Sequence, residues 1–561
     1  MSVTYWTRSQ VALAIAAAAL TMAAPVSAQA LPDILASGSP YLPDFSYAGY
    51  GYGIADIPAN AGTIINVGDH GAVPNDGKDD SAGVLAAIAA AKAVDGPVTV
   101  RFAAGRYLIS EILWIERSDI TLSGMGMGEK GTILHMPRPL SQIDDSGALK
   151  EIREYLSENH KYERQPDANI DDLFSEYSWS AGFIWVRVPD GRPATYLERY
   201  DRPIETLADI ASGARATTQL TVADTENLSA GDVVQIHWYN RDGENGALID
   251  AMYGPEAERA DLPIGSRHWE LPERPLVRQA TRIEAIDGNR VTIADPLMID
   301  ISAEVPASFA RWDHLENVGL QDFAIEFPDN PDFGHHLEAG YNGVYFTAVH
   351  NGWIRNLRID EADSGILTDD LANVTIANVM TTGTHIAHYA VHVGNVHNVL
   401  VDNLVVQNPT VHTLSFNTQA TRSVYRGGTV FTKPTLDQHA GANMQNLYDA
   451  VTVHIDAVPG DDGKPMYDLY KAGGAGYWKP GHARYNTTWN LNIIVDSGAA
   501  PDETVTIFAG SEGPDARVIG MHGNRQLKLD FVPAPHVEHM NQALDTAPSL
   551  YGWQRRQRIT K

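Results

Sequence analysis

Four consecutive stretches of the chain repeat one pattern of short apolar strands and turns. They are Asn342–Asp363, Ser364–His388, Tyr389–His412 and Thr413–Ala440. Each begins with a short apolar strand and has a second one further along, and three of the second strands hold an asparagine at a matching place: Asn356, Asn378 and Asn403. A period of about 20 to 30 residues is typical of a solenoid, in which each coil buries its face against its neighbours.

The strands are short, and no helical segments separate them. This pattern favours a parallel β-helix over a sheet built from βαβ units. We therefore predict an all-β solenoid. Its long exposed face suits an extended polymer, so the predicted partner is a polysaccharide or oligosaccharide.

The first 28 residues have the features of a secretory signal peptide. Arg8 is the only charged residue, residues 11–24 form an apolar run, and Val26-Ser27-Ala28 offers small residues for cleavage. The run is shorter than the roughly 20 residues that a membrane-spanning helix needs. We therefore expect no membrane span, and export to the periplasm or the medium.

The formal net charge is −29, and the chain contains no cysteine. This charge argues against nucleic acid and anionic membranes as partners. Without disulfides, an exported chain depends on its core and its strand hydrogen bonds for stability. A polyanionic glycan would need a basic groove or a bridging cation to approach.

A block near the N-terminus carries a recognisable signature. Its segments are Asp69-His70-Gly71-Ala72, Asp76-Gly77-Lys78-Asp79-Asp80 and Gly105-Arg106-Tyr107-Leu108-Ile109, with an alanine-rich helix predicted over Ser81–Val94 and capped by Asp79 or Asp80. The block resembles the start of the pectate-lyase-like superfamily of right-handed parallel β-helices. This resemblance implies a right-handed β-helix and a carbohydrate-active protein. It carries over no catalytic residues, because it covers the N-terminal cap and not a groove.

The sequence divides into six segments. They are a signal peptide (1–28), an extended leader (29–61), a cap with the first coils (62–137), an inserted β-rich subdomain (138–315), the main coils (316–530) and a C-terminal tail (531–561). In the insertion we expect a helix over Asp144–His160. We also expect one strand pair joining 220–222 to 233–236 and another joining 283–286 to 291–293.

Equivalent turns of neighbouring coils stack at about 4.8 Å. One such ladder would gather Asp363, His388, Tyr389, His412 and His439, with His392 on the same exposed side. The predicted catalytic residues are therefore His388, Tyr389, His412 and His439, together with Arg484 from a later loop. Asp363 and His392 are predicted to bind substrate.

That later loop supplies further candidates. Tyr477 and Trp478 could pack against sugar rings, while Lys479 and His482 could bind polar groups of the substrate. Asp363, Asp369 and Asp370 offer hard oxygen ligands, so they are the candidate site for Ca²⁺. The chain has no His-Glu-x-x-His motif and no cysteine, which disfavours zinc.

Three functions remain open from the sequence. The first is a polysaccharide lyase for a uronate glycan: Tyr389 or His388 removes the proton, and His412, His439 or Arg484 stabilises the intermediate. The second is a glycoside hydrolase with two carboxylates drawn from Asp360, Glu361, Asp363, Asp369 and Asp370. The third is a non-catalytic glycan-binding β-helix. The specific sugar and the oligomeric state are not specified by the sequence.

Overall fold

The computed structural model describes residues 29–36, 41–58, 62–159, 175–189, 204–259, 262, 264–331, 334–511 and 513–560. The predicted signal peptide lies outside these residues. Among the helices described, none is both long enough and apolar enough to cross a membrane.

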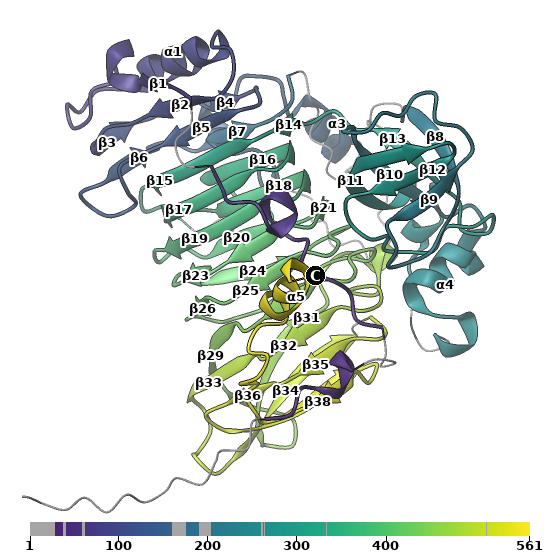
Figure 1. The fold of residues 1–561 in the computed structure, drawn as a ribbon. Helices are drawn as coiled ribbons and strands as arrows, with labels where there is room; N and C mark the ends of the chain where they lie inside the picture. The colour runs from purple at the N-terminus through teal and green to yellow at the C-terminus, as the bar shows by residue number, and fades with distance from the viewer. Residues whose placement is uncertain are drawn as a thin grey trace, which may run out of the picture.

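Two long sheets of parallel strands form the body of the molecule, a right-handed parallel β-helix (Figure 1). In the second sheet, four stacked strands are β16 (Asn342–His350), β18 (Ser364–Ala372), β20 (Ala387–Val393) and β24 (Thr410–Phe416). Val344 pairs with Ile366, Ile366 with Val391, and Val391 with Leu414, and all four are buried. The predicted alignment of the coils is therefore confirmed.

The second strand of each coil joins the other sheet. Its successive members include β17 (Trp353–Asp360), β19 (Thr375–Thr382), β22 (Leu400–Asp402) and β25 (Val424–Arg426). The three matched asparagines form a ladder along this sheet: Asn403 Nδ2 donates to Asn378 Oδ1 (2.9 Å), and Asn378 Nδ2 donates to Asn356 Oδ1 (3.2 Å). All three have positive φ, between 52° and 57°, which asparagine tolerates better than most residues.

The N-terminal block caps the first coils. Helix α1 (Ser81–Lys92) confirms the predicted helix, and Asp79 Oδ1 accepts a hydrogen bond from its first N–H at 2.9 Å. Asp80 has a different role, because its two oxygens accept from the N–H groups of Val73 (2.7 Å) and Leu108 (3.0 Å). Asp79 therefore caps the helix, and Asp80 joins the turn before the helix to β3 (Gly105–Leu108).

The insertion contains a closed six-stranded barrel beside the coils (Figure 1). Its strands are β8 (Thr206–Gly213), β9 (Gln219–Val222), β10 (Val233–Tyr239), β11 (Pro275–Asp287), β12 (Arg290–Ile293) and β13 (Ala307–Arg311). The predicted pairing of 283–286 with 291–293 is confirmed. The predicted pairing of β9 with β10 is wrong: β9 lies between β8 and β12, because the barrel closes in a different order.

The predicted helix of the insertion is shorter than expected. Helix α3 spans Lys150–Asn159 and does not begin at Asp144. Asp144 lies in a turn instead, where its Oδ1 accepts hydrogen bonds from the backbone N–H and the hydroxyl of Ser146 (3.1 and 2.6 Å). This local pairing competes with helical hydrogen bonding.

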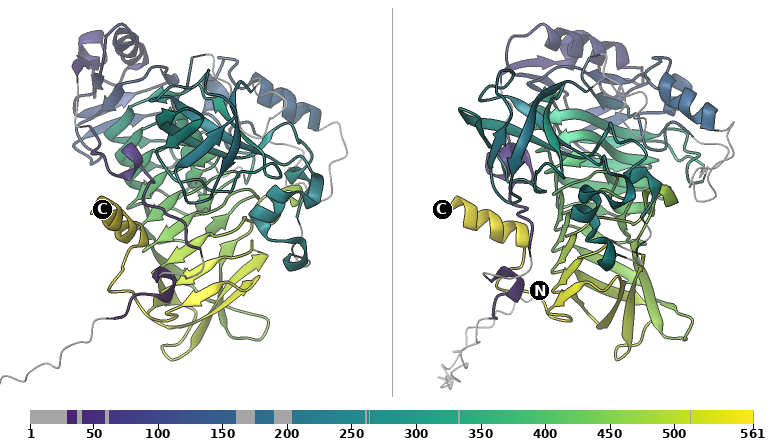
Figure 2. Two further views of the ribbon diagram at one scale, coloured as in Figure 1. Left: turned by 45° about the vertical axis from the view of Figure 1, so that its right-hand side comes forward. Right: turned by 90° about the vertical axis from the view of Figure 1, so that its right-hand side faces the viewer.

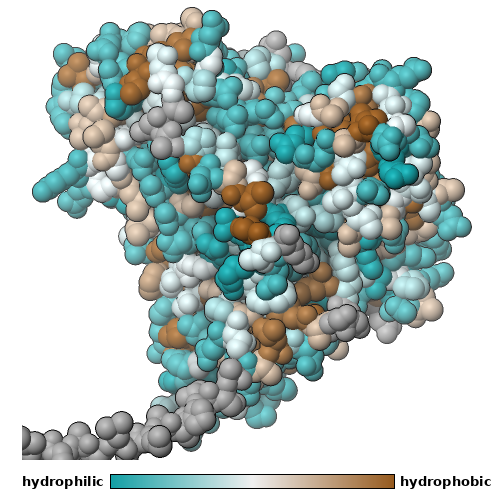
Figure 3. Space-filling model, viewed as in Figure 1, coloured by the Kyte–Doolittle hydropathy of each residue, from teal (hydrophilic) through white to brown (hydrophobic). Residues whose placement is uncertain are grey.

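The leader and the C-terminal tail pack together along one side of the coils (Figure 2). Helix α5 (Leu550–Ile559) is the docked tail, and Tyr551 Oη donates to Ala48 O at 3.0 Å. Asp449, from the coils, accepts hydrogen bonds at the N-terminus of α5 from Ser549 Oγ (2.6 Å) and Leu550 N (2.8 Å). On this face, hydrophobic side chains form small groups between hydrophilic ones (Figure 3).

Candidate functional site

A group of imidazoles gathers where β20, β24 and β27 (Leu436–Gln438) meet the loop that precedes β16. We call this group the histidine cluster. It consists of His335, His336, Glu338, His388, Tyr389, His392, His412, Asp437 and His439.

Strand register builds the centre of the cluster. Tyr389 on β20 is paired with His412 on β24, and their rings stack with centroids 5.0 Å apart. The ring of His388 stacks on that of Tyr389, with centroids 4.3 Å apart, and its centroid lies 5.2 Å from that of His412. The structure therefore brings together three of the predicted catalytic residues, and the parallel ladder fixes their spacing.

Asp437 connects two further imidazoles. Its Oδ2 atom lies 3.1 Å from His412 Nδ1 and 3.2 Å from His439 Nδ1, and accepts a hydrogen bond from Ser415 Oγ at 2.7 Å. His439 follows β27, so its predicted place in the turn before a strand is wrong, although its ring still lies 4.7 Å from that of His412. His412 and His439 are therefore linked through the carboxylate of Asp437, and not because they occupy equivalent turns of neighbouring coils.

Burial alone would raise the pKa of Asp437. The charges and hydrogen bonds of His412 and His439 outweigh this effect and hold its pKa well below the usual range. Asp437 is therefore a fixed anion, and at neutral pH it has no proton to donate.

Glu338 holds the other end of the cluster. Its Oε1 atom lies 2.8 Å from His388 Nδ1 and accepts from His336 N at 3.0 Å, while Ser178 Oγ donates to Oε2 at 2.7 Å. Sequence reasoning missed His335, His336 and Glu338, because they lie in a loop outside the aligned coils. The signal was the run Gly334-His335-His336-Leu337-Glu338.

Most of the imidazoles are neutral near neutral pH. Burial lowers the pKa of His388 well below its usual value, lowers that of His392 to about 3, and lowers that of His335 to about 4. His392 Nδ1 lies 3.2 Å from the carbonyl oxygen of Thr368, so Nδ1 carries the proton of this neutral ring. A neutral imidazole has one nitrogen with a lone pair, which can accept a proton or bind a metal.

His335 Nε2 lies close to the Nε2 atoms of two other rings. His335 Nε2 lies 3.2 Å from His388 Nε2 and 3.3 Å from His412 Nε2. His335 also stacks on His336, with ring centroids 3.6 Å apart. The loop residue His335 thus lies between two residues that come from adjacent strands.

The predicted calcium site is not assembled. Asp363 precedes β18, and Asp370 lies near the other end of this strand, so the strand rise separates them by roughly 20 Å. A calcium ion binds its oxygen ligands at about 2.3–2.6 Å. The assignment of Asp363, Asp369 and Asp370 to one Ca²⁺ ion is therefore wrong.

Each of the three carboxylates has partners of its own. Asp369 accepts from Asn395 at 2.7 Å, and Asp370 accepts from Gln235 and Trp312 of the insertion (2.8 and 2.7 Å). Asp363 is buried: its Oδ2 accepts two backbone N–H bonds at 2.8 Å, and its Oδ1 lies 2.9 Å from His385 Nε2. These contacts give Asp363 a positioning role beside the cluster rather than the predicted contact with substrate.

The loop that holds Tyr477, Trp478, Lys479 and His482 is only partly accessible to a substrate. Trp478 is 5% exposed, lies edge-on against His268 and packs on the barrel core, and His482 is 1% exposed. The prediction that Trp478 binds sugar is therefore wrong, because it packs on His268 and the barrel core, whereas His482 is as buried as His388 and Tyr389 and its contact with substrate stays a prediction. Tyr477 is half-buried against the barrel. Lys479 lies near His439 and donates from Nζ to the carbonyl oxygen of Gly473 at 3.2 Å.

Arg484 contacts neither Tyr389 nor the imidazoles through any interaction described for it. Its Nε donates to Asp515, and its guanidinium lies 4.9 Å from the ring centre of Tyr485. The predicted catalytic set therefore separates into His388, Tyr389, His412 and His439, which gather, and Arg484, which is held elsewhere.

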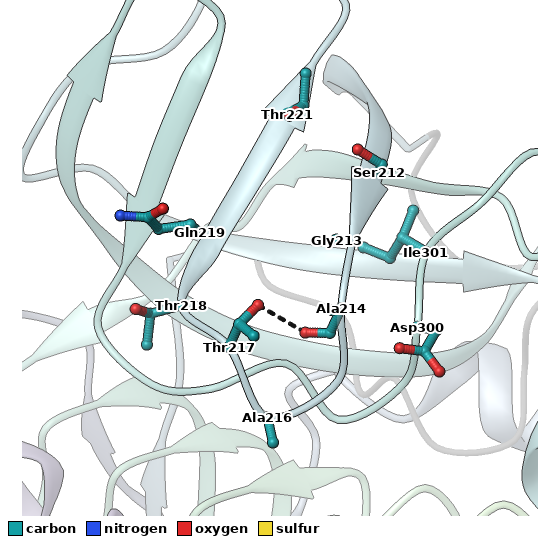
Figure 4. Close-up of a pocket in the computed structure, with 10 residues that line it drawn as sticks. All are labelled: Ser212, Gly213, Ala214, Ala216, Thr217, Thr218, Gln219, Thr221, Asp300 and Ile301. Atoms are coloured by element: carbon teal, nitrogen blue, oxygen red, sulfur yellow. Dashed lines mark hydrogen bonds between the residues drawn. The ribbon is translucent and has the colours of Figure 1, made fainter.

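Two cavities bear on the location of the site. One of about 950 Å³ reaches Glu338 and is also lined by Arg153, Tyr177, Leu337 and Tyr341. The other, of about 830 Å³, lies on the barrel between β8, β9 and Asp300, the only titratable side chain in its lining (Figure 4). The first cavity therefore borders the cluster at Glu338, while the second offers little proton-transfer chemistry.

No protein-family model matches the chain, and no curated protein matches its sequence. Among solved structures, it is similar to the tailspike of Pseudomonas phage LKA1, with 13% identity and a TM-score of 0.44 over 84% of this chain and 81% of that chain. It is also similar to the tailspike of Pseudomonas phage phi297 (14% identity, TM-score 0.42, 85% and 80% covered). A third is the A-module of the Azotobacter vinelandii mannuronan C-5 epimerase AlgE4 (12% identity, TM-score 0.32, 84% and 97% covered).

Proposed function

We propose that the protein is an exported carbohydrate-active enzyme that cleaves a uronate-containing glycan by β-elimination at the histidine cluster. One observation carries this proposal. The rings of Tyr389, His388 and His412 contact one another, with centroids 4.3, 5.0 and 5.2 Å apart, and each of the two imidazoles has its Nδ1 atom next to a buried carboxylate. A phenol among imidazoles is equipped for proton transfer at a carbon atom.

In this reaction a base removes the proton next to the carboxylate of the uronate. The C–O bond to the leaving sugar then breaks, its electron pair leaves with the oxygen, and that oxygen takes up a proton. We assign proton removal to Tyr389, whose Oη accepts a hydrogen bond from Asn417 Nδ2 at 3.3 Å. Burial lowers the pKa of His439, so we assign this ring, beside Lys479, to the negative charge that develops on the substrate, and the leaving oxygen takes its proton from water.

The hydrolase alternative has less support. It needs two carboxyl groups facing one bond, and one of them must hold a proton at neutral pH. The pKa of Asp437 is lowered, which is the wrong direction for an acid. Asp360 lies 2.8 Å from Arg358 Nε, and Glu361 accepts from the backbone N–H groups of the loop that follows β19.

The test is purified full-length protein on a panel of uronate and neutral glycans. Ultraviolet absorbance of the unsaturated product and the appearance of reducing ends are followed together. A rise in both signals supports elimination. Reducing ends without ultraviolet absorbance would mean hydrolysis, and silence in both, with glycan binding retained, would mean a non-catalytic binding protein.

A matched pair of variants locates the reaction. Tyr389→Phe keeps the ring and removes only the hydroxyl. The control is Tyr467→Phe: Tyr467 lies outside the cluster, and its Oη donates to Pro434 O at 3.0 Å. Loss of activity in the first variant alone supports the assignment to Tyr389, and equal activity in both would refute it.

A further inference from the structure

We infer that His335, His388 and His412 form a binding site for one divalent transition-metal ion, through their Nε2 atoms. The proposal concerns metal binding by this chain and does not depend on the reaction proposed above. It differs from the calcium site expected from the sequence in its residues, in its donor atoms and in the class of metal.

The first argument is spacing. In a tetrahedral zinc site the Zn–N distance is about 2.0–2.1 Å, so two ligand nitrogens lie about 3.3 Å apart. His335 Nε2 lies 3.2 Å from His388 Nε2 and 3.3 Å from His412 Nε2. His335 Nε2 is therefore separated from each of the other two nitrogens by the distance expected between ligands of one ion.

The second argument is the environment of the opposite nitrogens. His388 Nδ1 lies 2.8 Å from Glu338, and His412 Nδ1 lies 3.1 Å from Asp437. Histidines that bind metal usually direct their other nitrogen at a carboxylate or carbonyl oxygen, which fixes the tautomer and leaves the Nε2 lone pair for the metal. Glu338 and Asp437 thus lie beside the outer nitrogens of two of the ligands.

The third argument is charge. With protons on the two Nδ1 atoms, the Nε2 lone pairs of His388 and His412 both face His335 Nε2; one N–H there can satisfy only one of them, whereas a cation can accept both. Glu338 and Asp437 place two carboxyl groups next to the three rings. A divalent cation neutralises both of them, whereas a single shared proton neutralises one.

The donor atoms select the metal. Imidazole nitrogens suit Zn²⁺, Ni²⁺ and Cu²⁺, whereas Ca²⁺ and Mg²⁺ prefer oxygen ligands. Three protein ligands leave a fourth position of a tetrahedral ion for water or for an anionic oxygen. If the proposed function is correct, the uronate carboxylate is the group that this position would bind.

The experiment uses full-length protein treated with a chelator and then titrated with Zn²⁺ in a calorimeter, with the bound metal counted by elemental analysis. We expect one Zn²⁺ per chain in the wild type. His335→Gln removes a ligand from a partly exposed loop and should abolish this binding. Glu338→Gln should weaken it by about 10- to 100-fold, as expected when a carboxylate partner of a ligand is lost.

His454→Gln is the matched control. His454 Nδ1 also lies close to a carboxylate, 3.0 Å from Asp496, but outside the cluster. This variant should bind Zn²⁺ as the wild type does. Circular dichroism and thermal unfolding of each metal-free variant establish that it is folded. His412→Gln serves as a second ligand variant if His335→Gln does not fold.

Two outcomes would overturn the proposal. One is a wild type that binds no more Zn²⁺ than His335→Gln. The other is binding that survives His335→Gln and His412→Gln but is lost in His350→Gln, because His314, Glu316 and His350 form another group with ligand atoms close together. Co²⁺ gives an independent readout: three nitrogens and one oxygen around it should produce the intense visible absorption of a tetrahedral ion, and a weak octahedral spectrum would contradict the site.

Discussion

Tyr389 and His412 are paired in neighbouring parallel strands, and their rings stack with centroids 5.0 Å apart. Strand hydrogen bonds on both sides hold the two backbones, so no flexible loop is needed to bring the rings together. The phenol and the imidazole are consequently pre-positioned, which reduces the reorganisation needed during a reaction.

Removing the phenol oxygen should affect activity far more than stability. We expect Tyr389→Phe to lower the rate of glycan cleavage by about 100-fold or more, because a positioned acid or base typically contributes that much. The ring remains stacked, so the free energy of unfolding should change by no more than about 1 kcal/mol. Initial rates measure the effect on activity, and urea denaturation measures the effect on stability. A Tyr389→Phe variant that is less stable but fully active would contradict this expectation.

Burial of His392 makes stability depend on pH. Its folded pKa is lowered to about 3, against about 6.5 in an unfolded chain, so the unfolded state binds an extra proton between these values. The contribution of His392 to stability is therefore complete above about pH 6.5 and is lost as the pH falls towards 3. Urea denaturation at several pH values gives the slope of the free energy of unfolding against pH. Between about pH 3 and 6.5, His392→Gln should reduce this slope by the equivalent of up to about one bound proton. An unchanged slope would contradict the expectation.

The asparagine ladder predicts an unusual ranking of variants. Asn378 has a φ of 52°, where alanine is disfavoured by about 1–2 kcal/mol and glycine is not. Both substitutions remove the hydrogen bonds to Asn356 and Asn403 equally. Asn378→Gly should therefore be more stable than Asn378→Ala in thermal unfolding, and the opposite order would show that the backbone strain is not present.

The docked C-terminal helix offers a matched pair on one element. Leu550 is fully buried and Ile559 is 56% exposed. Leu550→Ala should lower the free energy of unfolding by about 2–4 kcal/mol, and Ile559→Ala should change it by less than about 0.5 kcal/mol. Equal effects in denaturant titrations would mean that α5 does not remain docked in solution.

The sequence was informative wherever a repeat carried the signal. Inward residues such as Val344, Ile366 and Val391 recur with the coil, so the strands, the register and the asparagine ladder followed from the alignment. In the insertion no repeat exists. Local turn signals therefore predicted the hairpin of β11 and β12 but could not predict that β9 pairs across the barrel with β8 and β12.

The same division applies to the candidate site. His388, Tyr389 and His412 lie on aligned strands, and their proximity was predictable. His335 and Glu338 come from a loop whose path depends on tertiary contacts, such as the hydrogen bond from Ser178 Oγ to Glu338. The strand rise also separates Asp363 from Asp370, which a grouping of acidic residues along the sequence does not take into account.

The leader has a consequence for how the molecule comes apart. It bonds to several coils in turn: Gly51 N donates to Asn351 Oδ1 at 3.0 Å, Tyr50 N to Thr375 Oγ1 at 2.9 Å, and Gly49 N to Asn398 O at 2.8 Å. A plain solenoid has only nearest-neighbour contacts and can fray from either end. Here one strap joins distant coils and is itself held by the last helix, so the loss of any one coil loosens the attachment of the others. The stack should melt in a single cooperative transition rather than peel away coil by coil.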